Sequence, residues 1–272
     1  MNTVRRTWWK TALGLVFVVI MLFPVYWMLN VSLTPRSDIR NGDLYPKNLT
    51  LEHYSVVLHQ QLPFLATSLV VGLGAVALTL VISAPSAFAL SKLYVPGRKS
   101  LNFLLIVAQM IPAVVMALGF YTIYSRLDIL NTVPGLILAD STIAVPFAVL
   151  LFTAFMLGIP RELMQAAQID GASHWRSFIS VVMPVSRNSA VTVALFTFLW
   201  AWSDFLFAST LNREGGKLRP ITMGIYDYIG AQNQEWGPMM ATAVLASIPT
   251  AILLIVAQRY VAAGVTAGAV KD

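Results

Sequence analysis

Long apolar runs separated by short polar stretches make up most of this chain. Six of these runs are long enough to cross a hydrocarbon core of roughly 30 Å at about 1.5 Å per helical residue. They occupy residues 11–33, 64–90, 101–124, 133–157, 189–208 and 239–261. A lipid-exposed backbone must satisfy its own hydrogen bonds, so the pattern predicts six transmembrane helices in an all-α integral membrane fold.

The polar stretch between the fourth and fifth runs, residues 158–187, keeps a helical periodicity. Two sets of positions follow the spacing i, i+3, i+4, i+7: Leu163, Ala166, Ala167 and Asp170, and then Trp175, Phe178, Ile179 and Val182. Gly171 lies between the sets, where a glycine adopts positive φ at little cost, and Ser173 is placed to cap the second helix. The pattern predicts two amphipathic helices joined by a glycine turn.

Composition agrees with a membrane protein. The chain is 57% hydrophobic and 11% charged, with a mean hydropathy of +0.72, whereas soluble domains carry roughly 25% charged residues. It contains no cysteine, which excludes disulfides and cysteine-ligated metal sites.

The distribution of Lys and Arg predicts the orientation in the membrane. If the amino terminus is cytoplasmic, these residues are more numerous in the cytoplasmic segments than in the outer loops. The cytoplasmic ones are then Arg5, Arg6, Lys10, Lys92, Arg98, Lys99, Arg161, Arg176, Arg187, Arg259 and Lys271. We therefore expect both termini to be cytoplasmic. The basic pI of about 9.7 reflects this bias and contact with anionic lipid, and it requires no nucleic acid partner.

The order of residues in the 158–187 stretch is that of a known motif. The sequence QAA at 165–167 is followed after three residues by Gly171, and after nine more by VVMP at 181–184. This order resembles the EAA loop of binding-protein-dependent ABC importer permeases, which reads E-A-A, three residues, G, nine residues, I-x-L-P. Gln165 departs from the family Glu, although Glu162 lies one turn earlier.

Other segments resemble the sugar-importing branch of that family, and specifically the smaller, maltose-type permease partner. They are FPVYWMLNVSLTP at 23–35, AFALSKLYVPGRK at 87–99, FLWAWSDFLFA at 198–208 and QRYVAAGVTAGAVKD at 258–272. The resemblance implies a type I importer fold in a single permease domain, 1–272. Residues 64–263 would form its translocation core, 11–33 an additional first span, and 158–187 the cytoplasmic coupling loop.

The resemblance also implies partners in the cytoplasmic (inner) membrane. These are a second homologous permease, two ATPase subunits, an external solute-binding protein and a carbohydrate as the solute. The coupling residues that it implies are Glu162, Gln165, Ala166, Ala167, Asp170, Gly171, Ala172, Trp175, Phe178 and Pro184. The chain has no phosphate-binding G-x-x-x-x-G-K-[ST] loop, so ATP hydrolysis must belong to a partner. We expect no catalytic residue, metal site or cofactor in the chain itself.

Two carboxylates within the apolar runs are candidates for the solute pathway. Charges inside a bilayer are costly and tend to face a cavity or a partner. The candidate residues are Asp140, Ser141, Trp202, Ser203 and Asp204. Tryptophans are also ordinary at membrane interfaces, and an aspartate at a helix end often only contacts water, so a structural role for this group is an open alternative.

Three other readings compete with an ATP-driven importer. The two amphipathic helices of the 158–187 stretch would suit a position in the lipid headgroups, although two alanines make the first apolar face thin. An ion-coupled transporter would use Asp140 and Asp204 as a titrating pair, but it usually shows an inverted repeat, which the sequence lacks. A membrane enzyme would need a clustered set of nucleophile and base, whereas the three histidines are scattered.

Overall fold

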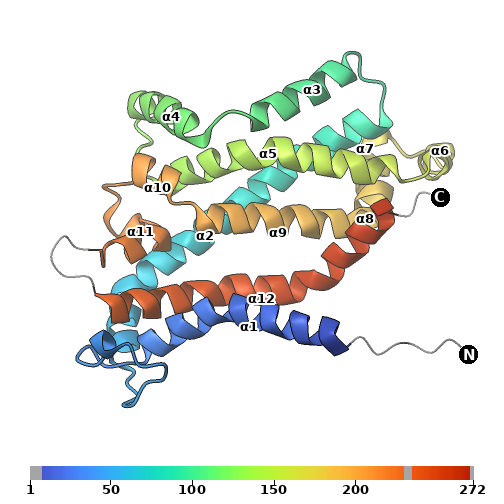
Figure 1. Ribbon diagram of the computed structural model, residues 1–272. Helices are drawn as coiled ribbons and strands as arrows, with labels where there is room; N and C mark the ends of the chain where they lie inside the picture. The colour runs from blue at the N-terminus through green and yellow to red at the C-terminus, as the bar shows by residue number, and fades with distance from the viewer. Residues whose placement is uncertain (1–7, 230–234, 270–272) are drawn as a thin grey trace, which may run out of the picture. The chain divides into compact units, whose positions relative to one another are not determined.

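The computed structural model describes residues 8–229 and 235–269, and the regular elements of this part are helices (Figure 1). Four helices are long and apolar enough to cross a membrane: α1 (Trp8–Ser32), α2 (Glu52–Lys92), α5 (Val133–Leu157) and α12 (Trp236–Ala269). Two bent helix pairs, Arg98–Gln109 with Ala113–Leu127 and His174–Val185 with Arg187–Ser203, pass the same test when each pair is taken together, which gives up to six spans. The expectation of six spans therefore holds only if each bent pair crosses as one.

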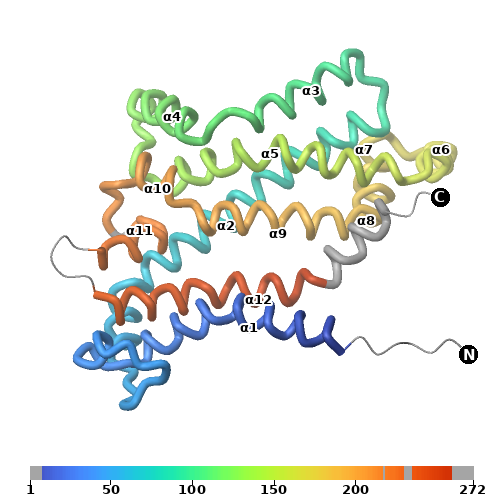
Figure 2. Tube along the Cα trace, in the orientation of Figure 1, coloured from blue at the N-terminus to red at the C-terminus, as the bar shows by residue number. Residues whose placement is uncertain are grey.

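The third predicted span is not one continuous helix. It consists of α3 (Arg98–Gln109) and α4 (Ala113–Leu127), whose axes are bent by 93° at residues 110–112 (Figure 2). Pro112 has an extended ψ of 131° and immediately precedes α4. A proline lacks the backbone N–H of a helix interior and disfavours helical geometry in the residue before it, which explains the break.

The fifth predicted span, 189–208, is also interrupted. Helix α9 (Arg187–Ser203) ends where Asp204 takes an extended conformation, with φ −65° and ψ 125°, and α10 (Leu206–Leu211) begins two residues later. The prediction of one helix through this region is wrong. Hydropathy alone continues across the break because the residues on both sides are apolar.

Helix α2 is longer than the apolar run that predicted it. It begins at Glu52 instead of residue 64, and its 41 residues span roughly 60 Å, about twice the thickness of the hydrocarbon core. The extra turns at its start are rich in polar residues, so hydropathy predicted only the apolar part of α2, which has the length of a membrane span.

The described chain divides into two compact units. The first comprises the described residues within Met1–Leu62 and Ile225–Ile248, and the second those within Pro63–Gly224 and Pro249–Asp272. In the first unit, the polar loop after α1 contains a one-turn helix, η1 (Ile39–Asn41), and its hydrogen bonds fix its course.

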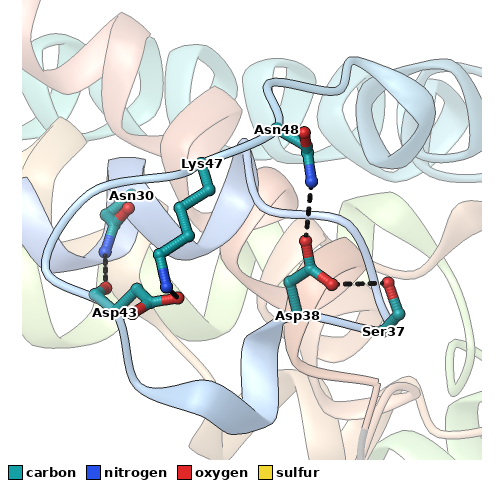
Figure 3. A network of polar contacts seen from close by, with 6 residues as sticks. All are labelled: Asn30, Ser37, Asp38, Asp43, Lys47 and Asn48. Atoms are coloured by element: carbon teal, nitrogen blue, oxygen red, sulfur yellow. Dashed lines mark hydrogen bonds and ion pairs between the residues drawn. The ribbon is translucent and has the colours of Figure 1, made fainter.

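A carboxylate network holds that loop together (Figure 3). Asn30 Nδ2 donates to the Asp43 carbonyl over 2.8 Å, and Lys47 Nζ lies 2.9 Å from the Asp43 carboxylate. Asn48 and Ser37 both donate to the carboxylate of Asp38, over 3.2 Å and 2.8 Å. The hydrogen bond and the charge of Asp43 raise the pKa of the Lys47 ammonium above its ordinary value.

The second unit is built around α5. Half of the most apolar window of α5 is buried, and α5 contacts α3, α9 and α10. One apolar cluster lies between α2, α5, α9 and the polar insert, and includes Phe88, Phe152 and Val193. A second cluster lies between α4, α5 and α10, and includes Tyr124, Leu136 and Phe207. The short elements η3 (Gly216–Leu218) and α11 (Ile221–Tyr226) follow α10.

Candidate coupling loop and solute pathway

The insert after α5 has the predicted helix, glycine turn and second helix. Helix α6 (Arg161–Ile169) ends with Asp170 as its C-cap, and Gly171 follows with a φ of +82°. The Gly171 N–H donates to the Gln168 carbonyl over 3.0 Å, and the Ala172 N–H donates to the Ala167 carbonyl over 2.9 Å. These two bonds form a Schellman motif, which satisfies carbonyls that the end of α6 would otherwise leave free.

The second arm begins with a capped turn and continues with unusual helical geometry. The Ser173 side chain accepts a hydrogen bond from the Arg176 N–H over 3.2 Å, as the capping prediction requires. Helix α7 (His174–Ser177) then passes into a π-helical turn, Phe178–Val182, and into α8 (Met183–Val185). Across the glycine turn, Gln168 Nε2 lies 3.0 Å from His174 Nδ1, which ties the two arms together.

Three buried side chains anchor this coupling loop to the second unit. Met164, Phe178 and Val182 belong to the same apolar cluster as Phe88 of α2. The rings of Phe88 and Phe178 have centroids 5.0 Å apart. The 158–187 stretch is therefore packed directly against side chains of α2, α5 and α9.

The opposite surface of the coupling loop is open. Ile169 is 87% exposed and Trp175 is 60% exposed, although both are apolar. Ile169 was not among the predicted coupling residues. Of those besides Trp175, Ala167 and Ala172 are half-buried, and the exposed ones are Glu162, Gln165, Ala166, Asp170, Gly171 and Pro184. Phe178 is the exception, because it is only 5% exposed and faces the cluster.

The periodicity selected the wrong apolar side for the first arm. Leu163 is 43% exposed, whereas its neighbour Met164 is 6% exposed and packs inward. The sequence analysis also missed Lys92, at the end of α2, whose ammonium donates to the Ile159 carbonyl where the chain enters the loop. A lysine that ends a long apolar run was the available signal for that contact.

The structure gives Asp204 a structural role. Its carboxylate oxygens accept hydrogen bonds from the N–H groups of Phe207, over 3.2 Å, and Ala208, over 2.9 Å. Thr222 Oγ1 donates to the Asp204 carbonyl over 2.7 Å. Asp204 thus satisfies two backbone N–H groups in the first turn of α10, at the point where the predicted fifth span is interrupted.

The remaining candidates for the pathway are mostly buried in the second unit. Asp140 and Ser141, both on α5, are 4% and 3% exposed, and the Ser141 hydroxyl donates to the Ile137 carbonyl. Trp202 is buried and stacks on Phe198 with ring centroids 5.2 Å apart, whereas Ser203 is exposed.

Each unit has a cavity that the sequence analysis did not identify. In the second unit, a cavity of about 550 Å³ is lined by Tyr121, Asn131, Ser209, Thr210, Arg213 and Glu214, among others. In the first unit, a cavity of about 330 Å³ includes Arg36, Arg40, Glu52, His53, Glu235 and Trp236. Within the described residues, no group of His, Asp or Glu side chains is arranged to hold a metal ion.

Comparisons with known proteins place these features in context. A family model described as "Binding-protein-dependent transport system inner membrane component" matches residues 82–267. The chain is 30% identical over 274 residues to the trehalose transport system permease protein SugB of Mycobacterium tuberculosis, with 100% of each chain covered. It is 30% identical over 268 residues to the diacetylchitobiose uptake system permease protein DasC of Streptomyces coelicolor, covering 97% of this chain and 96% of the relative.

A solved structure has the same fold. It is a chain of a bacterial ABC transporter involved in the import of the acidic polysaccharide alginate, with a TM-score of 0.82 and 21% sequence identity. The match covers 96% of the present chain and 98% of the other.

Proposed function

The chain belongs to the family of binding-protein-dependent transport system inner membrane components, and from this premise we propose that it moves a carbohydrate inward in an ATP-driven importer. As a member of that family it is a multi-pass, non-catalytic membrane subunit of an ABC importer. The predicted family and its all-helical permease fold are confirmed.

One observation supports the coupling mechanism most directly. The coupling loop has an exposed apolar surface on one side, with Ile169 and Trp175, and buried anchors on the other, with Met164 and Phe178. If an ATPase subunit binds the exposed side of the loop, its movement is transmitted through the buried side to α2, α5 and α9. Because cores are close-packed, such a displacement shifts neighbouring helices instead of being absorbed locally.

The carbohydrate substrate is supported by the two relatives named above, which are named for trehalose and diacetylchitobiose transport. The cavity that includes Tyr121, Asn131 and Glu214 combines an aromatic ring with hydrogen-bonding groups, a combination that suits a sugar ring. In our proposal Asp140 and Ser141 line the deeper pathway and Asp204 positions α10 at its outer end, beside Trp202 and Ser203.

The proposed assembly contains this chain, a second homologous permease, two ATPase subunits and an external solute-binding protein. Both termini and the coupling loop face the cytoplasm in this arrangement. The outer segment between α10 and α12 is proposed to contact the binding protein; its residues 230–234 lie outside the described part of the chain.

Co-purification tests the coupling role. Ala166→Trp places a large side chain on an exposed small residue of α6, and we expect the tagged chain to lose its ATPase partner. Ser100→Trp, at an exposed position in the first turn of α3, is the matched control and should keep the partner. Retention of the ATPase together with normal uptake in Ala166→Trp would refute the proposed contact.

Uptake by proteoliposomes tests the transport class. With the whole complex and its binding protein, labelled disaccharide should accumulate only when ATP is enclosed, and an ionophore should leave the rate unchanged. Accumulation that stops with the ionophore and ignores ATP would instead favour the ion-coupled alternative.

A further inference from the structure

A basic groove lies beside the coupling loop, in the second unit. Its volume is about 740 Å³, and it is lined by the α2–α3 turn, the start of α3 and the first residue of α6. Four of its lining residues are cationic and none is acidic: Lys92, Arg98, Lys99 and Arg161. We propose that this groove binds the phosphate headgroup of an anionic phospholipid.

Charge balance is the first argument. Like charges held together destabilise one another unless an anion compensates them. Among the described residues, none of the four groove cations lies in an ion pair with a carboxylate. Arg161 repels Lys92, and Glu162, which attracts it, does not line the groove.

The start of α3 adds to the positive potential. Gly97 precedes this 12-residue helix without a side-chain cap, and its first turn contains no acidic residue. The free N–H groups of a helix start carry partial positive charge, and Arg98 and Lys99 lie on the same turn. This placement is unfavourable for an empty groove and favourable for one that contains a phosphate.

The surroundings identify the source of the phosphate as lipid. No residue of α3 is buried, and its apolar side chains begin one turn after the cations, with Phe103 66% exposed and Leu104 65% exposed. A helix with such a surface lies against acyl chains, which puts Arg98 and Lys99 at headgroup depth. Tyr94, which is 95% exposed in the turn, is typical of the membrane interface.

The position suggests a consequence for transport. Lys92 donates to the Ile159 carbonyl, and Arg161 begins α6, so the groove is built on the same residues that lead into the coupling loop. A bound headgroup would screen the repulsion between Lys92 and Arg161 and so hold α6 against the end of α2.

Native mass spectrometry of the full-length chain in neutral detergent tests the site. The probes are phosphatidylglycerol, phosphatidylcholine and inorganic phosphate. Each basic residue near an anionic membrane surface adds to the free energy of binding. We therefore expect phosphatidylglycerol to bind at least about tenfold more tightly than phosphatidylcholine. The variant R98Q/K99Q/R161Q should lose that preference, while Lys92 is kept because it has a structural bond.

Two variants serve as controls. K10Q/R176Q/R187Q removes the same charge from cations that do not line the groove, and it should keep the preference; R98K/K99R/R161K should keep it as well. Equal phosphatidylglycerol affinity in the wild type and R98Q/K99Q/R161Q would overturn the proposal, as would an equal loss in K10Q/R176Q/R187Q. Displacement of the lipid by equimolar inorganic phosphate would assign the groove to a free ion instead.

Discussion

At the scale of single residues, Gly171 sets the geometry of the coupling loop. Its φ of +82° is costly for any residue with a side chain, by about 1–2 kcal/mol. A Cβ added there would meet nothing within 4 Å, so Gly171→Ala strains the backbone without a clash. We expect this variant to reduce ATP hydrolysis coupled to the binding protein, because the two arms no longer hold their angle.

Gly42 provides the control for this substitution. It has a φ of +66° and equally open surroundings, but it lies in the loop after α1. Gly42→Ala should therefore cause a similar loss of stability with coupled hydrolysis unchanged, as measured on purified complexes. If both variants lost coupling equally, the effect would be one of general stability and not of the hinge.

Asp204 allows a second test at this scale. Because its carboxylate accepts two backbone hydrogen bonds at the start of α10, Asp204→Ala should lower the stability of the protein by about 1 kcal/mol, whereas Asp204→Asn should retain most of it. Thermal unfolding in detergent measures this difference. If both variants unfolded like the wild type and both lost solute affinity, Asp204 would act on the solute and not as a cap.

Single residues also show where prediction from sequence succeeded and failed. Gly171 and Ser173 were predictable because positive φ and helix capping depend on local chemistry. The inward position of Met164 was not, because either side of a short helix with few apolar residues satisfies the periodicity. Asp204 was noticed as a carboxylate near the end of an apolar run, but its backbone partners depend on a helix break that the surrounding apolar residues conceal.

At the scale of elements, the coupling loop works only if one side is anchored and the other is free. Phe178→Ala removes a buried ring that contacts Phe88, which typically costs about 3–5 kcal/mol. We expect this variant to unfold at a lower temperature. We also expect weak coupling of ATP hydrolysis to transport, even in preparations that retain the ATPase subunit. Circular dichroism melting and ATPase co-purification, measured on the same preparations, separate the two effects.

Trp175→Ala is the matched substitution on the free side. Trp175 is 60% exposed and touches Phe178 at a centroid distance of 5.1 Å, so its removal should change the melting temperature little. Loss of ATPase co-purification with normal stability is the expected result. A large stability loss with an intact complex would mean that Trp175 packs internally and does not face a partner.

The elements also show the limits of hydropathy. It located the membrane portions of α1, α2, α5 and α12, because burial in lipid imposes a composition that is visible along the chain. The 93° bend between α3 and α4 follows a proline that was visible in the sequence, yet prolines also occur within α2, α5 and α12 without ending them. Tertiary packing decides which of these prolines breaks a helix.

At the scale of the whole molecule, the direction in which the chain crosses the membrane decides whether the coupling loop can reach a cytoplasmic ATPase. The natural chain has no cysteine, so single cysteines can report sidedness without a modified background. Leu49 in the loop after α1 is 74% exposed, and Tyr94 in the α2–α3 turn is 95% exposed. We expect a membrane-impermeant maleimide to label Leu49→Cys in intact cells and Tyr94→Cys only after permeabilisation.

The reason for this expectation is the excess of Lys and Arg on the Tyr94 side of α2, since positively charged loops are retained in the cytoplasm. Both side chains are exposed and flank the two ends of α2, so each serves as the accessibility control for the other. If Tyr94→Cys were labelled in intact cells and Leu49→Cys only after permeabilisation, the coupling loop would face outward. No ATP-hydrolysing subunit could then act on it, and the exposed side of Trp175 and Ile169 would need a different partner.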